Sequence, residues 1–464
     1  MADLANLDLL LRGTIVTPEA TLENGWIAVR GGSIVATGQG AEAPAAAQTI
    51  DYGEALILPG VVDGQTHATS CKGMEGIAET TRGALAGGVT TLVDMPFDNP
   101  LPLDRLERLT EKTAAIAEHA HADMALYGTA TRETGTTEMQ ALIDAGVCAF
   151  KISSFESSPT RFPRIAADLM LDMMEVLADT DLPLGLHNED QEIVRARMAE
   201  ARAAGRDGIE AHAEARPMAA ELAATAQFLA LAQASGAHAH PVHLTGAEGF
   251  AQVAAFAGLG ARVTGETCVH YLCLDAAQDG ARLGARMKVN PPIRAGRVEG
   301  LWQAIEAGQV AFTSSDHSSW PIDNKLTASI FDAGAGVPGL QTLLPLFYTL
   351  AEARGLDAAQ LAAAQLCTRP AQFFGLETKG AIAPGKDADF AVLERGSFVF
   401  DEASALDGLK WSPFHGDSFG VRVTATYLRG AQVWDGTNIL SAPGSGRYLA
   451  RGATGWFSDQ GQAQ

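Results

Sequence analysis

The stretch ALAGGVTTLVDM, residues 84–95, joins the end of an alanine-rich helix to an apolar strand through two adjacent glycines. Glycine suits the left-handed position that closes a helix, and an unbroken apolar run suits a parallel strand covered on both faces. The same order of helix, glycine and strand recurs at LIDAGVCAFKIS (142–153), FAGLGARVTGETC (256–268) and AIEAGQVAFTSS (304–315). The middle of the chain is therefore predicted to alternate helices with buried parallel strands.

Four more apolar runs complete this pattern: VVDGQTHA (61–68), ADMALYGTA (122–130), LPLGLHNED (182–190) and AHPVHLTG (239–246). Eight candidate strands alternating with helices over residues 55–385 predict an α/β fold of the (β/α)₈ barrel type. A doubly wound sheet is the alternative, and it is disfavoured because no GxGxxG follows the first strand.

The two ends of the chain have a different character, with short alternating strands and turns. Gly31 and Gly32 separate two apolar runs as in a hairpin, and the tail repeats the pattern at DADFAVLE and VRVTATYLRGAQVWDG. Residues 1–54 and 386–464, which include a C-terminal tail, are therefore predicted to pair into one small β-sandwich domain around a barrel at 55–385.

Composition excludes several classes of protein. The chain has 464 residues, 47% of them hydrophobic, which is too apolar for a disordered protein. Asp and Glu number 55 against 33 Lys and Arg, giving a net charge of −22, so neither a nucleic acid nor an anionic membrane is an expected partner. The five cysteines form no CxxC motif, and there is no basic leader or membrane-length apolar run; a cytoplasmic protein with reduced thiols is expected.

Polar side chains stand where five of the predicted strands end: His67, Lys151, His187, His243 and Asp316. In a barrel the carboxyl ends of the strands share one rim, so these distant residues can converge. Three imidazoles, a carboxylate and a buried lysine fit a divalent metal site. Taken singly, each also fits a structural role, for example Lys151 extending out of the core or Asp316 capping the next segment.

The remaining histidines are weaker candidates. His119, His121, His238 and His240 lie in alanine-rich, surface-like surroundings and are interpreted as bystanders. His270, on the seventh strand, fits either support of the site or a packed core position.

Several motifs together resemble the cyclic amidohydrolases of the hydantoinase, dihydropyrimidinase, allantoinase and dihydroorotase group. They are ILPGVVDGQTH, GALAGGVTTLVDMP, AFKIS, LHNED, VHLTGAEG, KVNPPIR, TSSDHS, GVPGLQTLLPL and KGAIAPGKDADFAVLE, in family order over nearly the whole chain. The resemblance implies a TIM barrel with a β-sandwich built from both ends, a divalent metal, a small cyclic amide or ureide as substrate, and a homodimer or homotetramer.

The resemblance also assigns the ligands. His67 and Asp316 would hold a first metal, a carboxylated Lys151 would bridge, and His187 and His243 would hold a second. Where the family has the first histidine of an HxH pair, this chain has Gln65, which still faces the site because alternate strand residues share a face. An amide oxygen is a poorer zinc ligand than imidazole, so one or two ions per chain are expected, zinc in general, with manganese as an alternative at the first position.

The sequence does not decide which subfamily the chain resembles most. Thr69 and Phe97 stand where dihydroorotases have an Arg and an Asn, and Glu156 stands where hydantoinases have a Tyr, with Phe155 beside it. The loop ATSCKG lacks the allantoinase motif, although DMPFDNPLP looks closest to allantoinases. Candidate substrate contacts are Asn290, Ala335, Gly336, Phe97, Phe155 and Glu156.

The implied reaction is hydrolysis of a ring C–N bond, with Asp316 as the general base and then acid. His317, next to this base, and His270 are expected to support it from behind. Two other classes remain open: a catalytically degenerate oligomer with a binding role, and a metal-dependent lyase of the same fold.

Overall fold

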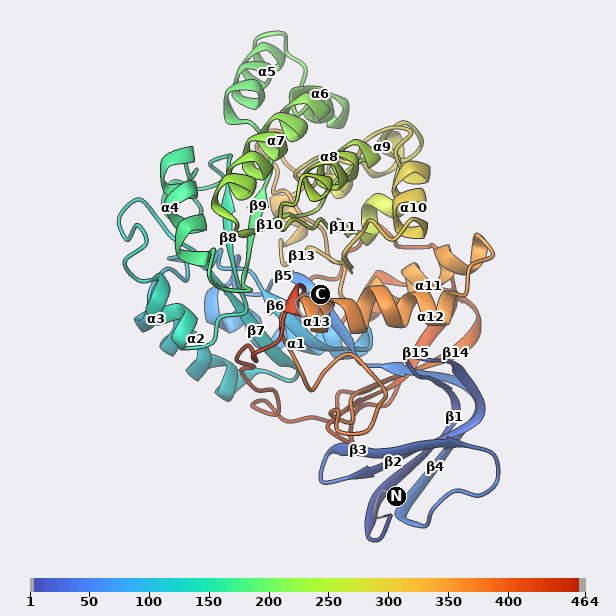
Figure 1. The fold of residues 1–464 in the computed structure, drawn as a ribbon. Helices are drawn as coiled ribbons and strands as arrows, with labels where there is room; N and C mark the ends of the chain where they lie inside the picture. The colour runs from blue at the N-terminus through green and yellow to red at the C-terminus, as the bar shows by residue number, and fades with distance from the viewer. Residues whose placement is uncertain (1–3, 459–464) are drawn as a thin grey trace.

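The computed structural model describes residues 4–458 and contains a barrel and a separate β-rich sheet (Figure 1). The barrel strands are β5 (Val61–His67), β6 (Val89–Asp94), β7 (Asp123–Gly128), β8 (Ala149–Ser153), β9 (Pro183–His187), β10 (His238–Pro241), β11 (Thr267–Cys268), β12 (Thr313–Ser314) and β13 (His317–Ser318). All eight predicted strand positions therefore carry a strand, and the (β/α)₈ prediction is confirmed.

The strands form one curled parallel sheet in the order β10-β9-β8-β7-β6-β5-β13, with β11 and β12 as a separate parallel pair. Ser153 on β8 pairs with His187 on β9, and Ser318 on β13 pairs with His67 on β5. This register brings the carboxyl ends of distant strands to one rim. Strands β11 and β12 are only two residues long, and an isolated bridge from Ala239 to Val263 connects β10 to the segment before β11.

Helices surround the strands (Figure 1). They are α1 (Gly76–Ala86), α2 (Leu106–His119), α3 (Met139–Asp144), α4 (Ala167–Leu177), α5 (Gln191–Ala203), α6 (Ile209–Ala215), α7 (Met218–Ser235), α8 (Ala247–Gly258), α9 (Ala276–Leu283), α10 (Val298–Glu306), α11 (Leu343–Ala353), α12 (Ala358–Ala363) and α13 (Arg369–Phe373). Each barrel strand up to β10 is almost fully buried, as expected for strands covered on both faces.

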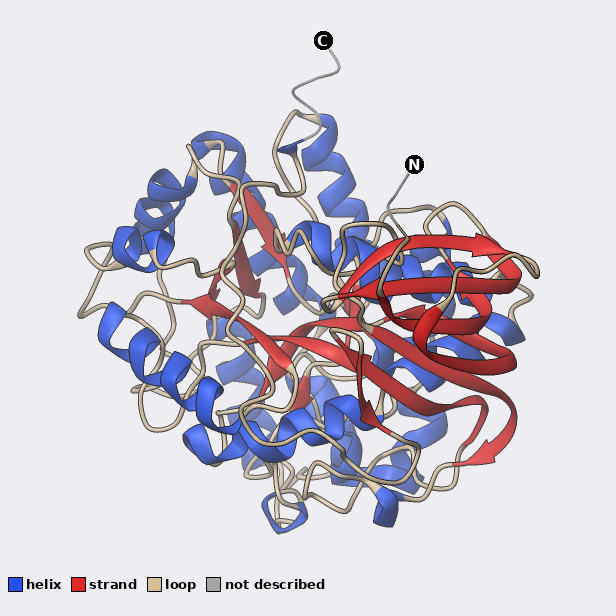
Figure 2. Ribbon diagram, turned by 90° about the horizontal axis from the view of Figure 1, so that it is seen from below, coloured by secondary structure: helices blue, strands red, loops and turns tan. Residues whose placement is uncertain are grey.

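Both ends of the chain build one seven-stranded sheet, seen at the right of Figure 2. Its strands are β1 (Leu7–Val16), β2 (Thr21–Arg30), β3 (Ser33–Gln39), β4 (Ala46–Pro59), β14 (Phe390–Val399), β15 (Ser418–Leu428) and β16 (Ala431–Trp434). Strand β14 pairs with β4, so the two ends join by main-chain hydrogen bonds as the sequence predicted. The strands from both ends enclose one apolar cluster that includes Leu11, Ile27, Phe390 and Tyr427.

A buried ion cluster joins this sheet to the barrel. Lys379 Nζ lies 2.6 Å from Asp123 on β7, 2.7 Å from Asp389 and 2.9 Å from Asp387, and Arg429 also pairs with Asp123. The three carboxylates are close enough together to suggest a cation site. The lysine and arginine already supply the positive charge there, so the cluster is an ionic joint between the two parts of the fold.

Candidate metal centre and substrate cavity

Six side chains that the sequence singled out line one cavity at the carboxyl ends of the barrel strands. They are Gln65, His67, Lys151, His187, His243 and Asp316. The cavity has a volume of about 360 Å³, which suits a small organic molecule. The barrel thus brings together residues that lie far apart in the sequence.

One half of the centre is a pair of imidazoles. His187 Nδ1 lies 3.0 Å from His243 Nε2, and the two rings meet edge to face. On its other side, His187 Nε2 lies 2.8 Å from a carboxylate oxygen of Glu189, which also pairs with Arg216. A carboxylate partner holds the ring proton on Nε2, so the Nδ1 lone pair of His187 faces His243.

The other half is formed by His67, Asp316 and Gln65. His67 Nε2 lies 3.4 Å from Asp316 Oδ1, and the Gln65 Nε2 amide donates a hydrogen bond of 2.9 Å to the same oxygen. Burial raises the pKa of Asp316, but His67, His243 and His270 lower it by more, so the carboxyl stays ionised at neutral pH. The Oε1 atom of Gln65 is buried and has no hydrogen-bond partner among residues 4–458.

Two of the candidate ligands have a left-handed backbone that side chains other than glycine rarely adopt. The φ angle is 45° at His243 and 47° at Asp316. Backbone conformations of this kind cost free energy and are held in place by the surrounding structure, often at functional sites. The strain here aims both side chains into the cavity.

Lys151 is buried inside the barrel and lines the same cavity. Its Nζ lies 3.7 Å from the sulfur of Met95 and has no carboxylate within ion-pair distance among the described residues. Burial lowers the pKa of Lys151, which increases the neutral fraction of the amine. Burial also raises the pKa of Glu266, a second buried group whose charge is felt at Lys151 and that the sequence analysis did not single out.

The residues present fit a divalent metal ion. Two imidazole nitrogens bound to one tetrahedral zinc at about 2.0–2.1 Å would be separated by roughly 3.3 Å. The observed 3.0 Å between His187 Nδ1 and His243 Nε2 is close to this separation. The carboxylate of Glu189 behind His187 is the partner that metal-binding histidines commonly have. At the other half, Gln65 presents an amide donor to Asp316, which suits a metal less well.

The predicted substrate contacts fall into two groups. Asn290, Ala335, Gly336, Phe97 and Phe155 line the cavity. The Oδ1 atom of Asn290 has no hydrogen-bond partner in the described chain, so it is free to meet a ligand. The Ala335 carbonyl already accepts a hydrogen bond of 2.7 Å from Trp320 Nε1, and the main-chain N–H of Gly336 donates to the main-chain carbonyl of Lys288 at 2.9 Å.

Glu156 is the exception, because the structure does not bring it to the cavity. Its carboxylate lies 3.1 Å from Arg195 at the surface, and its main-chain N–H donates to Gln191 at 3.0 Å. The neighbouring Phe155, in the bend that follows β8, lines the cavity instead.

His317 and His270 lie behind the cavity wall, and neither lines the cavity. His317 Nδ1 accepts a hydrogen bond of 3.2 Å from Gly339 N, and its Nε2 lies 3.2 Å from the Ser319 hydroxyl. Burial lowers the pKa of His270 to about 4, so this ring is neutral next to Asp316.

The interpretation of His121, His238 and His240 as surface residues is wrong for all three. They are buried, and His238 and His240 share the hydroxyl of Thr264, each at 2.8 Å. Strand β10 is covered on both faces, so its polar residues have no solvent side. Only His119 is partly exposed, with 40% of its side chain accessible.

Most of the charged, aromatic and methionine side chains that form the outer wall of the cavity were not expected from the sequence. They are Arg161, Phe162, Met198, Arg216, Lys288, Trp320 and Phe331. Arg161 and Phe162 lie in the irregular loop after β8, and Arg216 lies between α6 and α7. No periodic pattern marks these positions, so only the folded chain reveals them.

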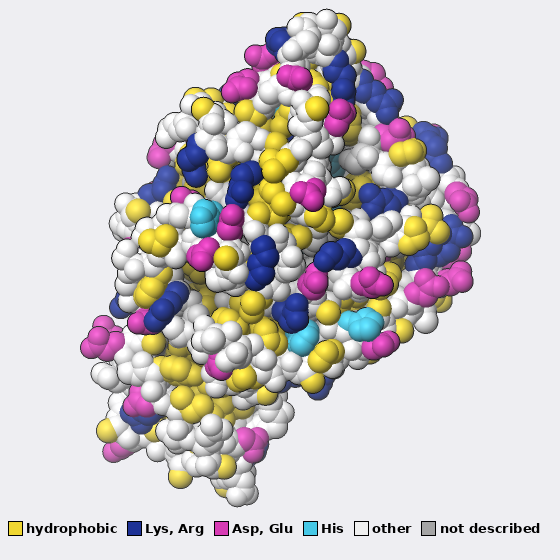
Figure 3. All heavy atoms as spheres, turned by 180° about the vertical axis from the view of Figure 1, so that it is seen from behind, with side chains coloured by type: hydrophobic (Ala, Val, Ile, Leu, Met, Phe, Trp, Pro, Cys, Tyr) yellow, Lys and Arg dark blue, Asp and Glu magenta, His cyan; other side chains and the backbone are white. Residues whose placement is uncertain are grey.

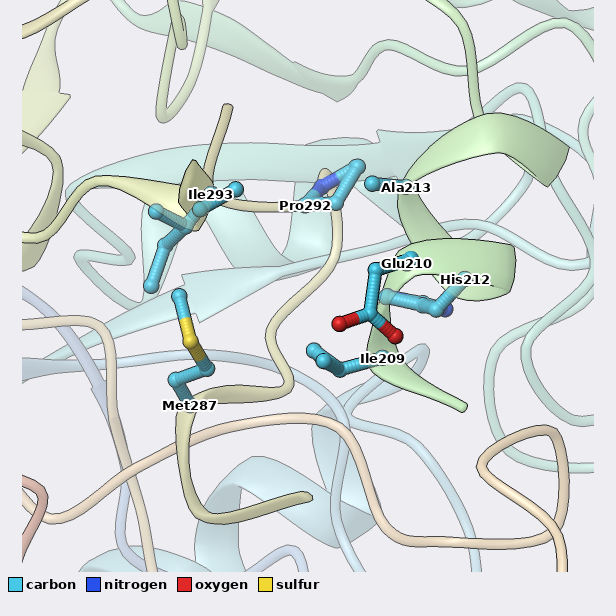
Figure 4. Close-up of a pocket in the computed structure, with 8 residues that line it drawn as sticks. Ile209, Glu210, His212, Ala213, Met287, Pro292 and Ile293 are labelled. Atoms are coloured by element: carbon cyan, nitrogen blue, oxygen red, sulfur yellow. The ribbon is translucent and has the colours of Figure 1, made fainter. Parts of the chain in front are cut away.

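A second, much smaller cavity lies between α6 and the segment at 287–293 (Figure 4). Its walls include Ile209, Glu210, Met287 and Ile293, and its volume is about 20 Å³. This is room for about one water molecule, so the small cavity is too small for a cyclic substrate.

On the face drawn in Figure 3, basic side chains are scattered among acidic ones, with no broad patch of either sign. Across residues 4–458, no helix combines the length and apolar character needed to cross a bilayer.

The fold and the site together define a (β/α)₈ barrel enzyme with a histidine and carboxylate centre at the strand carboxyl ends. The profile of the amidohydrolase family matches residues 56–433, and the chain belongs to this family. It is 36% identical to an allantoinase of Deinococcus radiodurans, over 96% of this chain and 99% of that one. It is also 36% identical to an allantoinase of Rubrobacter xylanophilus, over 95% and 97% of the two chains.

Among solved structures, the L-hydantoinase (dihydropyrimidinase) from Arthrobacter aurescens superposes with a TM-score of 0.91 at 27% identity. The match covers 96% of this chain and 100% of that one. A D-hydantoinase structure gives a TM-score of 0.88 at 26% identity, over 97% and 100% of the two chains. The family resemblance deduced from the sequence motifs is confirmed.

Proposed function

We propose that this protein is a metal-dependent hydrolase that opens a C–N bond of a cyclic amide, imide or ureide. The observation that carries the proposal is the convergence of the His187–His243 pair and ionised Asp316 on one cavity of about 360 Å³. Relatives of similar length are named allantoinases and a hydantoinase, and both names describe hydrolysis of cyclic ureides.

The ion would be held by His187, His243 and Lys151, with zinc as the expected metal. We propose that Lys151 is carboxylated, because its buried amine has a lowered pKa and the neutral amine is the form that reacts with carbon dioxide. A first position at His67 and Asp316 is proposed to bind more weakly, or to prefer manganese, because Gln65 donates to Asp316 in place of an imidazole ligand. A divalent ion here supplies a Lewis acid for the ring carbonyl and lowers the pKa of a bound water.

The side chains divide the remaining work. Asp316, ionised and aimed into the cavity, accepts a proton from the attacking water and delivers it to the leaving ring nitrogen. Asn290 presents an unpartnered amide oxygen that can accept a hydrogen bond from a ring N–H. Phe97 and Phe155 line the cavity and give a flat ring apolar surfaces to pack against.

The test is replacement of the proposed base with the metal content followed separately. Asp316→Asn is expected to lower kcat for hydantoin or allantoin by about 10²- to 10⁴-fold, the usual contribution of a positioned acid–base group. The exposed Asp323→Asn serves as the matched control. A turnover rate unaffected by Asp316→Asn would overturn the assignment, and absence of ring opening by the wild-type enzyme on all cyclic amides would overturn the proposed function.

We further propose a cytoplasmic homodimer or homotetramer. The five cysteines are all free thiols, which suits a reducing compartment. Light scattering on the purified chain tests the oligomeric state directly.

A further inference from the structure

The outer wall of the substrate cavity carries more positive than negative charge. Arg161, Arg216 and Lys288 line it, whereas Asp316 is the only carboxylate among the lining residues. This contrasts with the chain as a whole, whose net charge is −22. Arg216 is neutralised by Glu189 behind the wall, and Lys288 donates to the carbonyls of Ile330 and Ala333. Arg161 has neither a carboxylate partner nor a second carbonyl acceptor among residues 4–458.

Arg161 has no carboxylate within the 4.0 Å of an ion pair anywhere in residues 4–458. The nearby Asp98 is already engaged, with Lys112 at 2.7 Å and with the hydroxyl of Thr69. A guanidinium carries five N–H donors, and in Arg161 one of them, on Nη1, donates to the carbonyl of Ser70 at 2.6 Å. The other donors are left for a ligand in the cavity.

The position of Arg161 is fixed close to the proposed metal ligands. Its guanidinium stacks over the ring of Phe97, with 4.8 Å from Cζ to the ring centroid. Ser70, whose carbonyl accepts from Arg161, also holds His67 through its hydroxyl, at 3.0 Å from Nδ1. Phe97 in turn meets the His67 ring edge to face at 6.0 Å. The Arg161 guanidinium is therefore held on one face by Phe97 and lines the cavity.

We propose that the natural substrate is a cyclic amide or ureide with a carboxylate on its side arm, and that Arg161 binds this carboxylate. The inference rests on the proposed hydrolase function and specifies its substrate class. A planar guanidinium held by stacking is well suited to bind a carboxylate through two parallel hydrogen bonds. Such a carboxylate would also neutralise the charge of this partly buried guanidinium. A neutral side arm would leave this positive charge uncompensated in the enzyme–substrate complex.

The kinetic test uses three hydantoins that differ only in the arm at ring position 5: hydantoin-5-acetate, 5-methylhydantoin and allantoin, whose ureido arm is polar but neutral. The wild-type enzyme is expected to prefer hydantoin-5-acetate. In Arg161→Gln, the ratio of kcat/KM for the charged over the methyl substrate is expected to fall about 10- to 100-fold. Arg164→Gln is the matched control, because Arg164 lies three residues away and pairs with Glu192 at the surface, at 2.8 Å.

A binding measurement separates this inference from the proposed function. Titration calorimetry would compare N-carbamoyl-aspartate and N-carbamoyl-alanine, the ring-opened acids of the first two hydantoins, on the wild type and on Arg161→Gln. Tighter binding of the aspartate compound by the wild type, with the difference lost in Arg161→Gln, supports the inference even if none of the hydantoins is opened. A wild type that prefers allantoin, or a preference unchanged by Arg161→Gln, overturns it while leaving the hydrolase assignment in place.

Discussion

Glu189 offers the sharpest test of how the centre is organised, because one buried carboxylate serves two partners. It accepts a hydrogen bond from His187 Nε2 at 2.8 Å and pairs with Arg216. The side chains of Glu189 and Arg216 are 1% and 6% exposed, so solvent screens this pair little. Burial raises the pKa of Glu189, but Arg216 and His187 lower it by more, so the carboxyl is ionised. Glu189→Gln keeps the shape of the side chain and removes the charge.

Two separate effects are expected from Glu189→Gln. Breaking a buried ion pair leaves the Arg216 charge uncompensated, which costs about 3 kcal/mol in the free energy of unfolding. Loss of the carboxylate behind a metal-binding histidine weakens metal binding about 10- to 100-fold. The double variant Glu189→Gln with Arg216→Met removes the unpaired charge as well. It is expected to recover most of the stability and none of the metal affinity.

The assays are urea unfolding of the metal-free protein and competitive zinc titration against a chelating dye. Glu200→Gln is the matched control, because Glu200 pairs with Arg197 on an exposed helix face. Wild-type zinc affinity in Glu189→Gln would refute the role of Glu189 in orienting His187. A double variant no more stable than the single one would refute the argument from the buried Arg216 charge.

Two further predictions concern the metal position at Gln65 and the buried histidines. Gln65→His supplies the imidazole that this position lacks, so the amount of zinc bound per chain is expected to rise. Elemental analysis in the presence of bicarbonate measures it, and a zinc content equal to that of the wild type would contradict a weakened first position. Burial lowers the pKa of His240 to about 3, whereas the pKa of this side chain in the unfolded chain is about 6.5. Below pH 6.5 the unfolded state binds a proton that the folded state does not. The free energy of unfolding therefore falls by about 1.4 kcal/mol for each pH unit. His240→Asn removes this titratable group. The difference in free energy of unfolding between the wild type and the variant, measured by urea unfolding, should therefore shrink by about 2 kcal/mol from pH 7 to pH 5. A difference that stays constant over this pH range would contradict the prediction.

The barrel and the polar residues at its strand ends could be predicted because both produce local sequence patterns. Glycine after a helix and an apolar run before a histidine or aspartate identify a strand and the rim where it ends. The register of β8 against β9 and of β13 against β5 then follows from closing the barrel. His187, His243 and Asp316 meet for this reason alone.

The outer wall could not be predicted in the same way. Arg161 lies in a loop without periodicity, and its role depends on contacts with Ser70 and Phe97 that only the fold creates. The prediction that His238 and His240 lie at the surface was wrong for a related reason. Alternating His-Ala-His is typical of a strand with one exposed face, but every residue of β10 is buried in the barrel. Residues whose surroundings are set by tertiary contacts give no local signal.

The amide of Gln65, where the resemblance implies an imidazole, is expected to change the chemistry of Asp316 rather than remove it. In place of a ligand nitrogen facing an ion, Gln65 presents an amide N–H₂ that donates to Asp316 Oδ1 at 2.9 Å. That bond, with His67 at 3.4 Å from the same oxygen, fixes the direction of a carboxylate whose backbone is already held in the left-handed region. Asp316 is thus held ionised and oriented by side chains alone, so the role of base that we propose for it does not depend on a fully occupied first metal position. We therefore propose one tightly bound ion, held by Lys151, His187 and His243, with Gln65 serving to orient the base.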